Sequence, residues 1–257
     1  MRYKVTLSYD GSSFCGWQQQ PDADTVQERL QNALSTLLRA EIQVTGAGRT
    51  DSGVNAIGYV AHFDAPSGSD LDAASLVCKL NAILPRSIKV HEVIPAGPEF
   101  HARYDARLRE YTYFVHRVKD PFVDGYSYLC TYPLDVPAMN EAASFLTGTH
   151  DFSCFQKTGS DVVNPVCTVY AAGWSSYTPG HVSLMGFPAR DGDYLLFRIS
   201  ANRFLRNMVR AVVGTLIEVG RGRRTAESVK DLLQGGDRGA AGESVPGNAL
   251  FLNRVEY

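Results

Sequence analysis

The stretch Gly46-Ala47-Gly48-Arg49-Thr50-Asp51-Ser52-Gly53 places one carboxylate, that of Asp51, in a loop of small residues. A β-prone run at residues 42–45 leads into this loop, and a second extended run follows it. Glycines allow another molecule to approach the backbone closely, and an Asp in such a loop is either a turn residue or a reactive carboxylate. The loop lacks the Gly-Lys-Ser/Thr ending of a P-loop and is not GxGxxG, so its glycines indicate nucleotide binding only weakly.

The segments around the loop alternate between strand and helix patterns. The chain opens with a strand whose apolar face carries Tyr3, Val5, Leu7 and Tyr9. Thr25-Val26-Gln27-Glu28 has the form of a capping box and opens an amphipathic helix with the stripe Val26, Leu30, Leu34, Leu37 and Leu38. After the loop, Tyr59, Ala61 and Phe63 share one face of a strand. A second helix is predicted from about Asp70 to Leu84, where Pro85 ends it, and a strand over 88–93.

A composition break at Pro95, Gly97 and Pro98 separates these strands and helices from a second series of elements that resembles the first. The second series of elements begins with a strand that contains Tyr111 and Tyr113, and Tyr113 fits a core position. Its other predicted elements are a helix near Pro137, strands over 166–174, 182–187 and 194–200, and a long helix from an Asn202 cap to a Gly220 stop. The pattern predicts an α+β protein of two similar halves, with domains 1–105 and 106–257.

Composition excludes several classes of protein. With 257 residues, 44% of them hydrophobic, the chain has enough apolar material for one large or two small packed domains. It has no apolar run long enough for a transmembrane helix and no signal-peptide pattern, which favours the cytoplasm. Its five cysteines are scattered, without CxxC or zinc-ligand spacing, so we expect reduced thiols and no metal site.

The formal charge of −2 hides two basic segments. Residues 198–224 contain seven arginines and one glutamate, a net of +6, and residues 101–119 have a net of +3. The rest of the chain then carries −11. If the two segments lie together, they form a positive surface suited to a polyanion.

Within the predicted long helix, Arg203, Arg206 and Arg210 are three and four residues apart and would share one face. Three like charges on one face repel each other, so this spacing is more easily understood if an anion or a carboxylate meets them. By itself, however, the pattern favours a solvated basic face, because charge runs on helices usually serve solubility.

Motifs spread along the whole chain resemble the tRNA pseudouridine synthase A family. Gly48-Arg49-Thr50-Asp51-Ser52-Gly53-Val54 is similar to the family's GRTDxGVHA signature, with Asn55 in place of the usual His. Further similar blocks occur in order: Tyr9-Asp10-Gly11, Gly16-Trp17-Gln18-Gln19-Gln20, Phe100-His101-Ala102-Arg103, Arg109-Glu110-Tyr111-Thr112-Tyr113, His150-Asp151-Phe152, Asn164-Pro165-Val166 and Phe204-Leu205-Arg206-Asn207-Met208-Val209-Arg210. The tail Val245-Pro246-Gly247-Asn248-Ala249-Leu250 is a loose version of the family's AP..GL segment.

The resemblance implies an isomerase with the pseudouridine synthase fold, whose antiparallel sheets meet at a positively charged catalytic cleft. It implies that Asp51 is the catalytic carboxylate that acts on a flipped-out uridine, either by attacking C1′ or through a glycal. Tyr111 would then contact the uracil, Arg49 would fill the vacated stack or hold a phosphate, and Arg210 would pair with the carboxylate. The RNA backbone would be bound by Arg203, Arg206, Arg221, Arg223 and Arg224.

The resemblance further implies the anticodon stem-loop of tRNA as substrate, at positions 38, 39 and 40, no cofactor and a homodimer. Two alternatives remain open from the residues themselves. One is a non-catalytic RNA-binding or chaperone protein with the same basic cleft, in which Asp51 is only a turn residue. The other is a small-molecule nucleotide enzyme that uses residues 46–53 as a phosphate loop.

Overall fold

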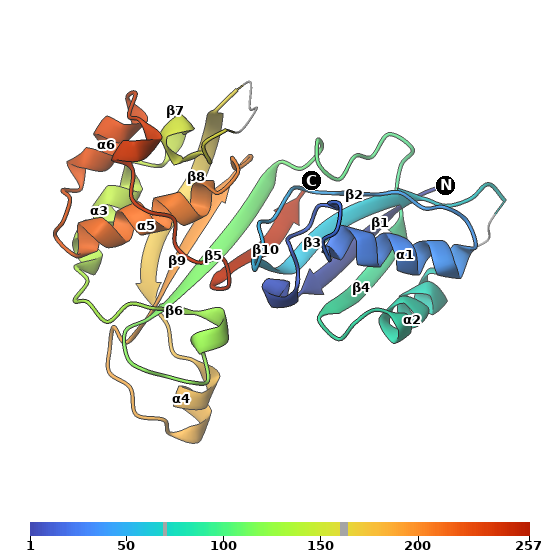
Figure 1. The fold of residues 1–257 in the computed structure, drawn as a ribbon, viewed down its shortest axis with the longest axis horizontal. Coiled ribbons are helices and arrows are strands. Elements are labelled where there is room, and N and C mark those ends of the chain that lie inside the picture. The colour runs from blue at the N-terminus through green and yellow to red at the C-terminus, as the bar shows by residue number, and fades with distance from the viewer. Residues whose placement is uncertain (69–70, 160–163) are drawn as a thin grey trace. The chain divides into compact units, whose positions relative to one another are not determined.

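The chain folds into two compact α+β units (Figure 1). The first unit contains Met1–Leu108 and Phe251–Tyr257, and the second contains Arg109–Leu250. The α+β class predicted from the sequence is confirmed. These units come from a computed structural model that describes residues 1–68, 71–159 and 164–257.

The extreme C-terminus belongs to the first unit, whereas the sequence predicted a second domain running from 106 to 257. The reason is the last strand, β10 (Leu250–Glu256), which pairs in parallel with β3 (Asn55–Asp64). Phe251 lies opposite Asn55 in this register. The strands of a parallel pair are joined by a long crossover rather than a tight turn, so local sequence pattern does not reveal their pairing.

The sheet of the first unit has the order β4-β1-β3-β10, with β2 also paired to β3. Its other strands are β1 (Arg2–Tyr9), β2 (Val44–Gly46) and β4 (Ile88–Pro95). β1 is antiparallel to both of its neighbours. Alternate residues of β1 are buried, which confirms the face predicted from its two-residue period.

Two helices that contact each other cover this sheet, α1 (Val26–Leu38) and α2 (Ala73–Ile83) (Figure 1). The Thr25 hydroxyl accepts a hydrogen bond from the Glu28 N–H, so α1 begins where the capping box predicted. Asp72 caps α2 by accepting from two backbone N–H groups, which sets its start at Ala73. The predicted start at Asp70 lies outside the described residues.

The second unit has a sheet in the order β5-β9-β8-β7, whose neighbouring strands are antiparallel, and β6 pairs with β5 in parallel. Its strands are β5 (Leu108–His116), β6 (Tyr128–Leu129), β7 (Gly148–Asp151), β8 (Val166–Ser176) and β9 (Tyr194–Ala201). Its helices are α3 (Val136–Ser144), α4 (Gly180–Met185), α5 (Met208–Gly220) and α6 (Glu227–Leu233). α3 packs against α5 and against β8 (Figure 1). Nearly every residue of α5 is buried.

The strand predicted over 182–187 is wrong, because this segment contains the short helix α4. Gly186 ends α4 in the left-handed region, with φ of 70°. His181 anchors the helix, since its Nε2 lies 2.6 Å from Oδ2 of Asp120, a buried carboxylate that also accepts from the Tyr194 hydroxyl at 2.7 Å. Leu184 is 86% exposed, so its hydrophobicity did not mark a buried strand face.

The long helix predicted from Asn202 begins only at Met208. The Asn202 side chain does not cap it, because its Oδ1 accepts from the Thr168 N–H on β8 at 2.9 Å. Asn207 then adopts a left-handed conformation, with φ of 66°, immediately before the helix. Arg203 and Arg206 therefore precede α5, and the prediction that they share one helix face with Arg210 is wrong.

Candidate active site

The Asp51 loop joins β2 to β3, as the sequence predicted, and hydrogen bonds to the sheet fix the residues before Asp51. The Ala47 N–H donates to the Val60 carbonyl at 2.8 Å, and the Tyr59 hydroxyl donates to the Gly48 carbonyl. Thr50 is buried, and its Oγ1 lies 2.8 Å from the Tyr9 hydroxyl. The residue before Asp51 is thus tied to the sheet of the first unit.

A second segment, Gly11–Trp17, runs along the other side of the loop and holds both neighbours of Asp51. The Trp17 N–H donates to the Thr50 carbonyl at 3.2 Å, and the Ser52 hydroxyl donates to the Phe14 carbonyl at 3.2 Å. Gly16 has φ of +93°, and a Cβ there would lie 2.5 Å from the Thr50 carbonyl oxygen, so this approach requires glycine. Asp51 itself stays half-buried between the two anchored residues.

The support given by this segment was not predicted from the residues, although a signal for it existed. The Tyr9-Asp10-Gly11 and Gly16-Trp17 motifs were identified only as blocks of a resemblance. In the structure the Trp17 ring stacks on Tyr59 with the centroids 4.0 Å apart. The motif residues therefore form one cluster with the Asp51 loop.

Tyr111 and Tyr113 occupy β5 of the second unit with different surroundings. Tyr111 is half-buried, and the ring of Phe204 meets it edge-on at 5.1 Å between centroids. Tyr113 is fully buried, as predicted, and its hydroxyl donates to the Pro246 carbonyl at 3.0 Å. Burial raises the pKa of Tyr113 far above its usual value, so its hydroxyl remains a donor. Of these two tyrosines, Tyr111 is the one with a partly accessible ring.

Arg210 lies in the first turn of α5 and is tied to the tail motif. Its Nε donates to the Val245 carbonyl at 2.7 Å, while the Val245 N–H donates back to the Arg210 carbonyl at 3.3 Å. Since Tyr113 binds Pro246 in the same tail, one short segment contacts both α5 and β5. The tail therefore sets the position of the Arg210 side chain.

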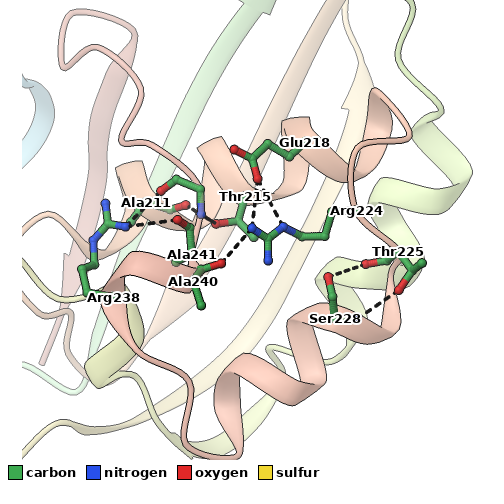
Figure 2. Close-up of polar contacts among 10 residues, drawn as sticks. Ala211, Thr215, Glu218, Arg224, Thr225, Ser228, Arg238, Ala240 and Ala241 are labelled. Atoms are coloured by element: carbon green, nitrogen blue, oxygen red, sulfur yellow. Dashed lines mark hydrogen bonds and ion pairs between the residues drawn. The ribbon is translucent and has the colours of Figure 1, made fainter.

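The remaining predicted arginines differ in how they are held. Arg206 and Arg223 are exposed. The Arg221 guanidinium lies over the Tyr132 ring, 3.6 Å from its centroid. Arg224 bonds to the Glu218 carboxylate at 3.0 Å and to the Ala240 carbonyl at 2.8 Å (Figure 2). Arg224 therefore links α5 to the chain after α6 within the protein.

Parts of the two basic segments lie side by side within the second unit. β5 and β9 pair so that Thr112 is opposite Arg198. Arg109 donates from Nη1 to the Asn202 carbonyl at 2.7 Å. Nε of Arg198 lies 3.9 Å from Oε1 of Glu110. The strand pairing thus brings together residues that are widely separated in the sequence.

The predicted site residues are divided between the two units. Asp51 and the exposed Arg49 belong to the first, whereas Tyr111, Arg210 and the other arginines belong to the second. Over the described ranges, no cluster of three or more His, Cys, Asp or Glu side chains is arranged to hold a metal ion. In that same part of the chain, none of the helices is both long and apolar enough to cross a membrane.

Comparisons with known proteins give one consistent family. Residues 6–105 and 142–257 match a family model described as tRNA pseudouridine synthase. Two relatives called tRNA pseudouridine synthase A, from Parabacteroides distasonis and Bacteroides fragilis, are 45% and 44% identical over 100% of this chain and 96% of theirs. A third of that name, from Bacteroides thetaiotaomicron, is 46% identical over 100% of this chain and 90% of its own. Because the match extends over nearly the whole chain, the protein belongs to the tRNA pseudouridine synthase family.

Proposed function

We propose that this chain is an isomerase that converts uridine to pseudouridine at positions 38, 39 and 40 in the anticodon stem-loop of tRNA. The observation that carries this proposal is the Asp51 loop, in which both neighbours of a half-buried carboxylate are fixed, within a chain of this family. In the reaction the N1–C1′ bond breaks, the uracil turns, and C5 bonds to C1′. N1 gains a proton and C5 loses one, so the reaction is balanced without another reactant.

Asp51 is proposed as the carboxylate that acts at the ribose, either by attacking C1′ or by removing a ribose proton to give a glycal. Either role needs the ionised form, which a nearby cation stabilises, and Arg210 is proposed for that ion pair. Tyr111 is proposed to stack on the uracil after the base has left its helix, and Arg49 to occupy the vacated space or hold a phosphate.

The arginines of the second unit are proposed to bind the phosphate backbone without reading sequence. Of these, Arg206 and Arg223 are supported by their exposure, together with Arg203 on the same loop as Arg206. Arg221 already contacts Tyr132, and Arg224 already contacts Glu218. These two arginines are therefore proposed to contribute less to RNA binding. We further propose a cytoplasmic homodimer, in which two basic faces would be pooled to bind one tRNA.

The substrate proposal is tested with a tRNA transcript labelled with tritium at C5 of uridine. We expect the purified protein to release label and to form pseudouridine only at positions 38 to 40. A transcript with cytidine at these positions should release no label above background. Pseudouridine formed at other positions instead would reject the proposed target, and a protein that binds this tRNA without releasing label would favour the chaperone alternative.

A further inference from the structure

Asn55 is the first residue of β3 and stands where the family motif usually has His. Its side chain is buried, with 2% exposure, and its Oδ1 accepts a hydrogen bond from the Gly11 N–H at 2.8 Å. Both groups lie away from solvent, where an unpaired backbone N–H is unfavourable. The amide of Asn55 therefore connects the strand that follows the Asp51 loop to the segment that lies along it.

Gly11 opens the turn Gly11–Ser13, which lies directly on the residues that follow Asp51. A Cβ on Gly11 would lie 2.1 Å from the Val54 carbonyl oxygen and 2.9 Å from the Gly53 carbonyl carbon. The turn is closed on its other side by Asp10, whose Oδ1 accepts from the Ser12 N–H at 2.9 Å. With so little space between turn and loop, a shift of the turn displaces residues 53 and 54.

The same segment continues to Phe14, whose carbonyl accepts from the Ser52 hydroxyl and, at 3.4 Å, from the Gly53 N–H. The Gly11–Trp17 segment thus contacts the loop on both sides of Asp51, and Asn55 fixes its first residue. Asn55 also follows Val54, whose N–H donates to the Asp51 carbonyl at 3.1 Å, so the bond to Gly11 is one of the contacts that connect Asn55 to the loop.

We infer that Asn55 is a positioning residue for the Asp51 carboxylate, which it acts on by fixing the Gly11–Trp17 segment against the catalytic loop. The inference rests on the proposed function, in which Asp51 acts at the ribose. A displacement of about 1 Å from the reacting geometry can lower a rate by about 100-fold. Loss of the Asn55 bond should therefore lower kcat while leaving the arginines, and with them tRNA binding, unchanged.

The test compares Asn55→Leu, which keeps the side-chain size and removes the acceptor, with a matched variant in the same unit. Asn81 also accepts a backbone N–H, that of Val90, at 2.8 Å, but it links α2 to β4. We expect Asn55→Leu to lower kcat by about 10- to 100-fold with KM for tRNA within about twofold. Asn81→Leu should lose stability and keep the wild-type kcat.

Two further measurements separate positioning from general loosening. Hydrogen exchange in Asn55→Leu should speed up in the peptides over residues 9–17 and 46–54 and remain unchanged over α2 and β4. Asn55→Asp keeps an acceptor oxygen, so its kcat should lie well above that of Asn55→Leu. Folded Asn55→Leu with the wild-type kcat, or equal losses in Asn55→Leu and Asn55→Asp, would overturn the inference.

Should Asn55→Leu not accumulate as a folded protein, Ser52→Ala provides the test. This exposed substitution removes the hydrogen bond to the Phe14 carbonyl in the same contact. A severalfold fall in kcat at unchanged KM supports the inference, and an unchanged kcat overturns it. Failure of the proposed function is distinguishable, because the wild-type protein would then form no pseudouridine in tRNA.

Discussion

The two units of the chain present their polar groups in opposite ways. In the first, the residues around Asp51 are held by hydrogen bonds to Tyr9, Phe14 and Trp17. In the second, Arg206 and Arg223 are exposed and lie on the two loops that flank an almost entirely buried helix, α5. A carboxylate that reacts with one atom requires a fixed position, whereas contacts to the phosphate backbone require positive charge and read no sequence. The first unit is therefore proposed to position the reacting carboxylate, and the second to supply the positive charge that binds phosphate.

The largest effect should come from the carboxylate of the first unit. Asp51→Asn keeps the size and removes the charge, so we expect turnover to fall by about a thousandfold or more. tRNA affinity should stay within about twofold, because all of the arginines proposed to bind RNA except Arg49 lie in the second unit. Release of label from C5-tritiated tRNA and filter binding measure the two quantities. Asp22→Asn, an exposed change in the same unit, serves as the control; substantial turnover in Asp51→Asn would remove Asp51 from its proposed role.

Acid should weaken the first unit through His62, which is 5% exposed and whose Nδ1 accepts from the Ala102 N–H at 3.1 Å. Burial, with the nearby charges of Arg2 and His101, lowers the pKa of His62 to about 4. The unfolded chain takes up this proton below about pH 6.5, so stability falls between pH 6.5 and pH 4 and is unaffected above that range. The loss is at most about 3 kcal/mol.

Chemical unfolding at pH 7 and pH 4.5 measures this pH dependence. His62→Gln keeps an acceptor and does not titrate, so its unfolding free energy should vary less with pH than that of the wild type. His91→Gln, at an exposed position on β4, is the matched variant with which His62→Gln is compared. An equal pH dependence in His62→Gln and the wild type would show that His62 does not contribute.

In the second unit, Tyr111→Leu should remove a stacking surface worth about 1–3 kcal/mol per base, which lowers kcat/KM by about 10- to 100-fold. Tyr111→Phe keeps the ring and should lose less. Tyr113→Phe removes the hydroxyl that donates to Pro246 and should lower stability rather than the kcat/KM of the folded protein. If Tyr111→Phe and Tyr111→Leu are equally impaired in steady-state assays, stacking is not the role of this ring.

The smallest effects should separate two neighbouring arginines. Arg223→Ala should weaken tRNA binding by less than about tenfold and reduce the slope of log affinity against log salt by roughly 0.7–0.9. Arg224→Ala breaks contacts to Glu218 and Ala240, so we expect a stability loss of about 1 kcal/mol and little change in the slope. Measuring tRNA affinity at several salt concentrations gives the slope for each variant. Equal slopes in Arg223→Ala and Arg224→Ala would contradict the prediction that only Arg223 makes a substantial phosphate contact.

Local patterns predicted the elements whose determinants are close in sequence. Thr25 caps the Glu28 N–H one turn later, and the alternating residues of β1 face a single core. The same reasoning failed at Asn202, whose side chain is a good helix cap in isolation. A residue of β8 competes for that side chain, and only folding brings the two together. The strand predicted over 182–187 failed similarly, because Asp120 anchors α4 from a distant segment.

The same distinction between local patterns and long-range contacts applies to the candidate site. The sequence identified Asp51, Tyr111 and Arg210 through motifs, since each motif is a short run of neighbouring residues. It did not identify Asn55 or Tyr9 as supports of the Asp51 loop, because the partner of each is a backbone or hydroxyl group about forty residues away. Contacts of this kind leave no periodic signal in the sequence.

By itself, the sequence determined the α+β class, most of the strands and helices, and the motifs that place the chain in its family, all of which depend on residues within a few turns of one another. The tertiary structure decided that β10 completes the first sheet beside Asn55, and that Arg203 and Arg206 lie outside α5. It also decided that Gly11–Trp17 lies against the Asp51 loop. These outcomes depend on which distant groups compete for the same hydrogen bonds, and that competition is settled only in the packed protein.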